Sequence, residues 1–80
     1  MTKSIHSKLY AEFTASLVDA RSRAKLSQRD LAKRLGRPHS YVAKLEIGER
    51  RIDIVEFIEL AAAMEADAVG ILKKVMKAGE

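Results

Sequence analysis

The side chains that could carry chemistry in this 80-residue chain are few, and their types argue against catalysis. There is no cysteine, and the two histidines, His6 and His39, are far apart in sequence. A thiolate or histidine metal site therefore lacks ligands, and we find neither a glycine-rich phosphate loop nor a nucleophile–base pair. We expect no metal, no cofactor and no enzymatic activity.

Basic charge is the chemical feature that the sequence does concentrate. The whole chain has a formal net charge of +4, but residues 21–51 hold ten Lys or Arg side chains and three acidic ones, a net of +7. Residues 1–20 are neutral overall, and residues 52–80 carry a net of −3. Such a block is typical of a surface that binds phosphates. A solvated helix face is the alternative, and charge alone does not decide between them.

Helical periodicity and capping residues show which elements must position this block. Apolar residues recur at spacings of three and four over residues 7–24, which predicts a first helix whose inner face carries Leu9, Phe13, Leu17, Ala20 and Ala24. The second helix is predicted to begin after Ser27, an N-cap with an acidic residue three positions on. It is predicted to end at Gly36.

Three further helices are predicted. Pro38 suits the opening of a third helix, which runs to about residue 47 and is ended by Gly48. Asp53 and Glu56 form a capping box in front of a fourth, apolar helix. Asp67 is the expected N-cap of a fifth. Because strand-like alternation is absent from the sequence, we expect an all-α fold of five helices.

The two short central helices and the glycine turn between them have the pattern of a helix-turn-helix. The residues expected to pack the two helices together are Leu31, Ala32, Leu35, Gly36, Val42 and Leu45. The stretch LSQRDLAKRLGRPHSYVAKLEIGERR, residues 26–51, resembles the Cro/CI-type helix-turn-helix family, also called Xre-type regulators. The Ser-Gln opening, the Leu-Ala pair, the Gly turn and the Leu-Glu-x-Gly ending carry this resemblance, which extends over roughly residues 13–72.

The resemblance implies a five-helix bundle of the lambda-repressor-like type that binds double-stranded DNA sequence-specifically. The expected role is a transcriptional regulator, in the first place a repressor, with helix 39–47 in the major groove. The expected base contacts are His39, Ser40, Tyr41 and Lys44. Lys44 can donate to guanine O6 and N7, and Tyr41 can pack on a thymine methyl group.

Phosphate contacts are expected from residues around this helix. They are Gln28, Arg29, Arg37, Arg50 and Arg51. Gln28 lies at a helix N-terminus, where backbone N–H groups favour anions, and the resemblance implies that its amide clamps the DNA backbone. With about five phosphates neutralised per subunit, the log–log slope of affinity against salt would be near −4 to −5.

The resemblance also implies a structural ion pair between Arg21 and Glu46, which would join the first helix to the end of the third. Two residues depart from the family's pattern. Pro38 stands where many relatives have a small polar residue, so the usual contact is missing, and recognition by shape or apolar packing becomes an alternative. Tyr41 is bulky where smaller residues are common. The sequence therefore does not assign an operator.

One domain of this size buries too little surface for tight, specific binding, so we expect a homodimer on palindromic or repeated half-sites about 34 Å apart. The last helix carries Val69, Leu72, Val75 and Met76 at spacings of three and four. We expect Val69 and Leu72 to close the core. Val75 and Met76 are the expected dimer surface.

Other functions of the same fold stay open. A helix-turn-helix domain can serve as a protein-interaction adaptor or as an antitoxin-type partner of a toxin. An adaptor would not need a +7 block aligned with Gln28 and Lys44. Within the regulator class, the sequence does not choose between a phage or plasmid repressor, a restriction–modification controller and an antitoxin.

The length is that of one small domain, residues 1–80, with its helix-turn-helix core at about 27–47 and short tails at both ends. The longest apolar runs are five residues, too short to span a membrane, and the N-terminus lacks the pattern of a secretory signal. We expect a soluble, cytoplasmic protein without a membrane partner.

Overall fold

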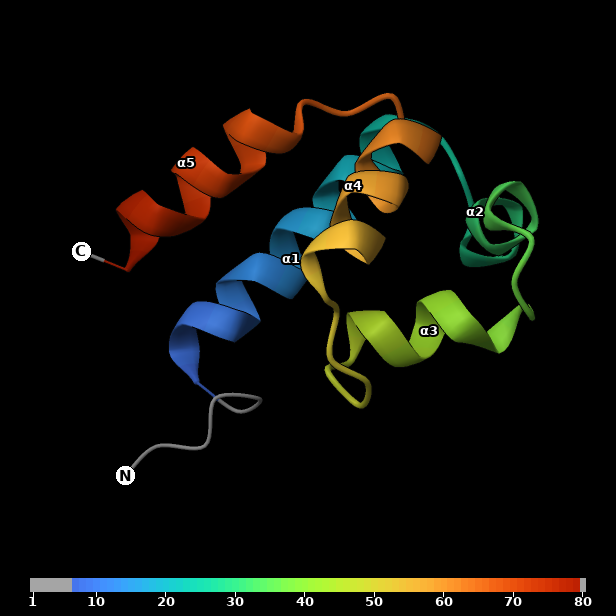
Figure 1. Cartoon of the computed structure of the whole chain (residues 1–80), viewed down its shortest axis with the longest axis horizontal. Helices are drawn as coiled ribbons and strands as arrows, with labels where there is room; N and C mark the ends of the chain where they lie inside the picture. The colour runs from blue at the N-terminus through green and yellow to red at the C-terminus, as the bar shows by residue number, and fades with distance from the viewer. Residues whose placement is uncertain (1–6, 80) are drawn as a thin grey trace.

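The computed structural model describes residues 7–79, which form five helices and no strand within that range. The helices are α1 (Lys8–Arg23), α2 (Gln28–Leu35), α3 (Ser40–Glu46), α4 (Ile54–Ala63) and α5 (Ala68–Ala78). Figure 1 shows α3 and α5 on opposite sides of α1 and α4, with α2 leading into α3. The expected all-α fold is confirmed. None of these helices is long and apolar enough to cross a membrane.

Helix starts follow the local sequence at α2 and α4. The Ser27 hydroxyl accepts from the Asp30 N–H at 3.0 Å, and the Asp30 carboxylate accepts from the Ser27 N–H at 3.1 Å. Asp53 and Glu56 form the same reciprocal box at 2.7 and 3.1 Å. Both boxes satisfy backbone donors that a helix start leaves unpaired. Asp67 precedes α5 but makes no side-chain cap hydrogen bond.

A residue with left-handed backbone follows each of the first four helices. Gly36, with φ of 68°, and Gly48, with φ of 77°, bracket α3. Lys25 and Glu65 adopt the same region, with φ of 60° and 54°, after α1 and α4. A side chain in this conformation costs about 1 kcal/mol or more, whereas glycine adopts it freely. The two turns on either side of α3 therefore carry no such strain, unlike the turns at Lys25 and Glu65.

The core lies where α2 and α3 meet α1 and α4. Its buried members are Leu17, Leu31, Ala32, Val42, Leu45, Phe57, Leu60 and Met64. Of the residues expected to pack the helix-turn-helix, Leu35 is half-buried and Gly36 is exposed at its turn. Leu9, expected on the inner face of α1, is 48% exposed, so that expectation is wrong. The remaining part of the α1 stripe faces the core.

The face of α5 that is buried differs from the expected one. Val69 and Leu72 are 60% and 37% exposed, whereas Val75 is buried at 8%. Because α5 packs against α1 and α4, only one edge of its wide apolar stripe is covered. Val75 therefore belongs to the interior and not to a dimer surface, while Met76, 69% exposed, is accessible as expected.

Candidate nucleic-acid interface

The outer side of α3 collects polar side chains that bind no other side chain or backbone group within residues 7–79. His39, Ser40 and Lys44 are exposed, and among residues 7–79 their side chains have no hydrogen-bond or ion-pair partner. Ser40 and Lys44 are four residues apart, so they share one face of the helix. Val42 and Leu45, on the opposite face, are each 1% exposed. The helix is thus anchored by its inner face and presents donors on its outer one.

A buried carboxylate fixes the C-terminal end of α3. Arg21 Nε and Nη2 donate to the two Glu46 oxygens at 2.7 and 3.1 Å, and Gln28 Nε2 donates to Glu46 Oε1 at 2.7 Å. Arg21 Nη1 also donates to the Leu26 carbonyl at 2.9 Å. We call Arg21, Gln28 and Glu46 the Glu46 cluster. It contains the ion pair that the family resemblance implies and ties α3 to α1 and to the start of α2.

Gln28 has an intramolecular partner that the sequence did not indicate. One amide N–H of Gln28 is committed to Glu46, so any phosphate contact by this side chain must use the other N–H. The contact with phosphate stays a prediction. Its geometry would be preset by Glu46, because that bond holds the amide in place.

A second carboxylate lies near the other end of α3. Glu56 Oε2 accepts from Tyr41 Oη at 2.9 Å and from Arg50 Nη1 at 2.7 Å, and Glu56 Oε1 accepts from the Asp53 N–H at 3.1 Å. We call Tyr41, Arg50 and Glu56 the Glu56 cluster. Burial raises the pKa of Glu56, but the hydrogen bonds from Asp53, Arg50 and Tyr41 outweigh it and hold that pKa below its ordinary value.

This cluster gives Tyr41 a different place from the one expected. Tyr41 is half-buried, and its hydroxyl is directed to α4 instead of to a base. Burial and the bond to Glu56 raise the pKa of Tyr41. The guanidinium carbons of Arg37 and Arg50 lie 4.9 and 5.2 Å from its ring centroid. The sequence assigned Glu56 only a capping role, and its spacing from Tyr41 gave no signal of contact.

The expected phosphate contacts divide into groups with different surroundings. Arg29 and Arg37 are exposed, and Arg37 lies over the Tyr41 ring. Arg51 is exposed and lies over the Tyr10 ring, 4.7 Å from its centroid. Arg50 is instead paired with Glu56. Glu56 therefore neutralises the charge of Arg50, and the four arginines do not contribute equally to the positive charge around α3.

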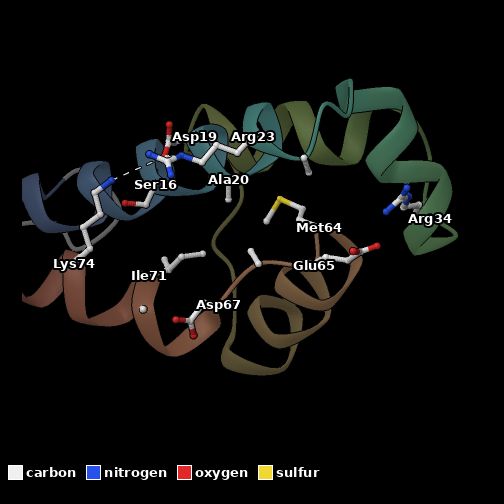
Figure 2. A pocket seen from close by; sticks show the side chains of 13 residues that line it. Ser16, Asp19, Ala20, Arg23, Arg34, Met64, Glu65, Asp67, Ile71 and Lys74 are labelled. Atoms are coloured by element: carbon white, nitrogen blue, oxygen red, sulfur yellow. Dashed lines mark ion pairs between the residues drawn. The ribbon is translucent and has the colours of Figure 1, made fainter.

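A groove of about 540 Å³ lies away from α3, between α1, the α4–α5 turn and α5 (Figure 2). Its lining is neutral overall, with three acidic side chains (Asp19, Glu65 and Asp67) and three basic ones (Arg23, Arg34 and Lys74). Asp19 lies 2.9 Å from Arg23 and 4.0 Å from Lys74. Arg34 at its edge donates to the Ala63 carbonyl at 2.8 Å. This groove therefore does not extend the basic face.

The structure offers no metal centre within residues 7–79. No group of three or more His, Cys, Asp or Glu side chains is arranged there to hold an ion. His6 lies outside the described residues, and His39 stands exposed at the start of α3.

An all-α domain with a glycine turn between two short helices, and with the second helix facing outward in a basic segment, defines a helix-turn-helix protein. The sequence profile of a helix-turn-helix domain family matches residues 12–70. Among solved structures, an XRE-family like protein from Pseudomonas syringae pv. tomato str. DC3000 aligns with a TM-score of 0.87 and 38% identity. That alignment covers 96% of this chain and 94% of the other. A comparison with curated proteins gives no match.

The chain therefore belongs to the Xre-type helix-turn-helix family, and the resemblance seen in the sequence is confirmed. At the level of that family it is a DNA-binding regulator. Such regulators are typically not enzymes.

Proposed function

We propose that this protein is a sequence-specific transcriptional repressor that binds double-stranded DNA as a homodimer and places α3 in the major groove. The observation that carries the proposal is that α3 is held firmly in place while its outer face stays exposed. Its outer face presents side chains without partners among the described residues, while carboxylates hold the helix at both ends. A rigid helix with available donors is what direct recognition of base edges requires.

Base recognition would come from His39, Ser40 and Lys44. Lys44 can donate to the O6 and N7 atoms of guanine, and Ser40 can donate or accept. A good direct pair contributes about 1–3 kcal/mol of discrimination against the wrong base. With its hydroxyl on Glu56, Tyr41 serves in this proposal to shape the edge of the interface.

Phosphate contacts would come from Arg29, Arg37, Arg51 and the Gln28 amide. These contacts fix the register of the protein on the duplex and carry no sequence information by themselves. They surround α3 on α2 and on the loops before and after α3. The protein would therefore bind any duplex weakly and in a salt-dependent way, and its operator more tightly.

The dimer surface is proposed on the uncovered side of α5. Val69, Leu72 and Met76 are 60%, 37% and 69% exposed, and an apolar series of this kind suits a second copy of the chain. Met76→Glu should shift the dimer to monomer in sedimentation and weaken operator binding. Lys77→Glu, which changes charge on an exposed polar position of the same helix, is the matched control. Equal behaviour of the two variants would contradict this surface.

Selection of bound sequences from random duplex DNA tests the proposed function. We expect a palindromic or repeated motif, and failure to recover one would contradict sequence-specific repression. Lys44→Ala should then relax the preference at one base position of each half-site. A uniform loss of affinity on all sequences would make Lys44 a phosphate contact instead.

A further inference from the structure

Arg50 lies in the loop after α3, where the family resemblance places a phosphate contact, yet its charge is already neutralised inside the protein. Arg50 Nη1 lies 2.7 Å from Glu56 Oε2, and its guanidinium carbon lies 5.2 Å from the centroid of the Tyr41 ring. The Arg50 side chain is 46% exposed, whereas that of Glu56 is only 11% exposed. The pair therefore consists of a half-exposed cation bound to a nearly buried anion.

Removing Arg50 from this pair would leave a nearly buried carboxylate without its cation. Glu56 would keep the Tyr41 hydroxyl and the Asp53 N–H, which are neutral donors. Breaking a buried pair by withdrawing one partner is strongly unfavourable, because the remaining charge has lost its solvation and its counter-charge. A phosphate at an exposed position offers a weaker attraction that salt screens. We therefore expect Arg50 to stay on Glu56 when DNA binds.

A paired guanidinium makes little contribution to the salt dependence of DNA binding. The slope of log affinity against log salt reports how many phosphates are neutralised by protein cations, at about −0.9 per phosphate on duplex DNA. Arg50 and Glu56 together carry no net charge. Arg29 is exposed on α2 and has no ion pair among the described residues, so its charge is available to a phosphate.

Building on the proposed DNA-binding function, we propose that Glu56 withholds Arg50 from the DNA backbone and so limits the number of phosphates that each subunit neutralises. Glu56 thereby lowers affinity for DNA of any sequence, without touching the residues proposed to contact bases. Because a genome offers a vast excess of non-specific sites, lower non-specific affinity leaves more protein for the operator.

Salt titration of binding to a short mixed-sequence DNA duplex tests this inference. Arg50→Ala should leave the slope of the unsubstituted protein unchanged, whereas Arg29→Ala should make it shallower by about 0.9. Glu56→Gln should make it steeper by about 0.9, because Arg50 is then available. The double variant of Arg50→Ala with Glu56→Gln should return to the original slope. Glu59→Gln removes an exposed acid from the same helix and should not change the slope.

A slope that becomes shallower in Arg50→Ala would overturn the inference, because Arg50 would then contact a phosphate directly. An unchanged slope in Glu56→Gln, with Arg50 present and the variant folded by circular dichroism, would overturn it as well. Glu56→Gln keeps a side-chain oxygen acceptor and leaves no unpaired charge, so it tests the inference even if Arg50→Ala, which strands the Glu56 carboxylate, fails to fold. Absence of DNA binding by the unsubstituted protein would contradict the proposed function itself.

Discussion

Two carboxylates attach α3 to the rest of the protein, and they do so in different surroundings. In the Glu46 cluster, the side chains of Arg21 and Glu46 are 16% and 6% exposed and meet through two hydrogen bonds. In the Glu56 cluster, the anion is 11% exposed but its cation, Arg50, is 46% exposed and uses one nitrogen. The first arrangement suits a fixed orientation of the helix. The second combines attachment with control of the charge presented beside the helix.

The largest expected effect breaks the Glu46 cluster. Arg21→Ala should lower the free energy of unfolding by about 3 kcal/mol, because Glu46 keeps only the Gln28 amide and the Leu26 carbonyl loses its donor. Urea denaturation measures this loss. Arg23→Ala on the same helix removes an exposed ion pair with Asp19 and should cost at most about 0.5 kcal/mol. Similar losses in both variants would contradict the difference drawn between buried and exposed pairs.

A smaller loss is expected at the Glu56 cluster. Glu56→Ala should lower the free energy of unfolding by about 2 kcal/mol, because the bonds that the Glu56 carboxylate accepts from the Asp53 N–H and from Tyr41 disappear while Arg50 returns to solvent. Thermal or urea unfolding of Glu56→Ala beside Glu59→Ala measures it. A loss as large as that of Arg21→Ala would mean that the two clusters are equivalent supports.

Tyr41→Phe separates the hydroxyl from the ring. It removes the donor to Glu56 but keeps the surface on which Arg37 and Arg50 lie, so a loss of about 1 kcal/mol in unfolding free energy is expected. The salt slope of DNA binding should not change, since Arg50 stays paired. A variant of full stability but altered base preference would instead place the hydroxyl at the DNA.

Acidification should remove the contribution of Glu56 to the free energy of unfolding. Its pKa in the folded protein lies below the ordinary value of 4.5, so its stabilisation is complete above 4.5 and is lost as pH falls through the folded pKa. The difference in unfolding free energy between the unsubstituted protein and Glu56→Gln should therefore narrow below pH 4.5. Asp30, whose pKa is also lowered, is present in both proteins and cancels. A difference that stays constant on acidification would contradict this assignment.

Much of the fold could be predicted because its signals are local. The boxes at Ser27 and Asp53 and the turn at Gly36 join groups within a few residues of one another, and the structure contains all three. The pairing of Arg21 with Glu46 spans 25 residues and was available only through resemblance to a family. The contact of Tyr41 with Glu56, across 15 residues, had no such guide.

The sequence by itself determined five helices, the capping boxes of α2 and α4, the basic segment and the position of α3 within it, since periodicity and capping act between neighbours. Tertiary structure alone decided which side chains around α3 keep an available charge. Arg50 and Arg29 are both arginines of the basic segment, but Arg50 lies beside the nearly buried Glu56 carboxylate and Arg29 does not. Tertiary structure also decided that α5 packs with Val75 buried and Val69 exposed. A periodic stripe defines an apolar face, but only the packed neighbours select the edge that is buried.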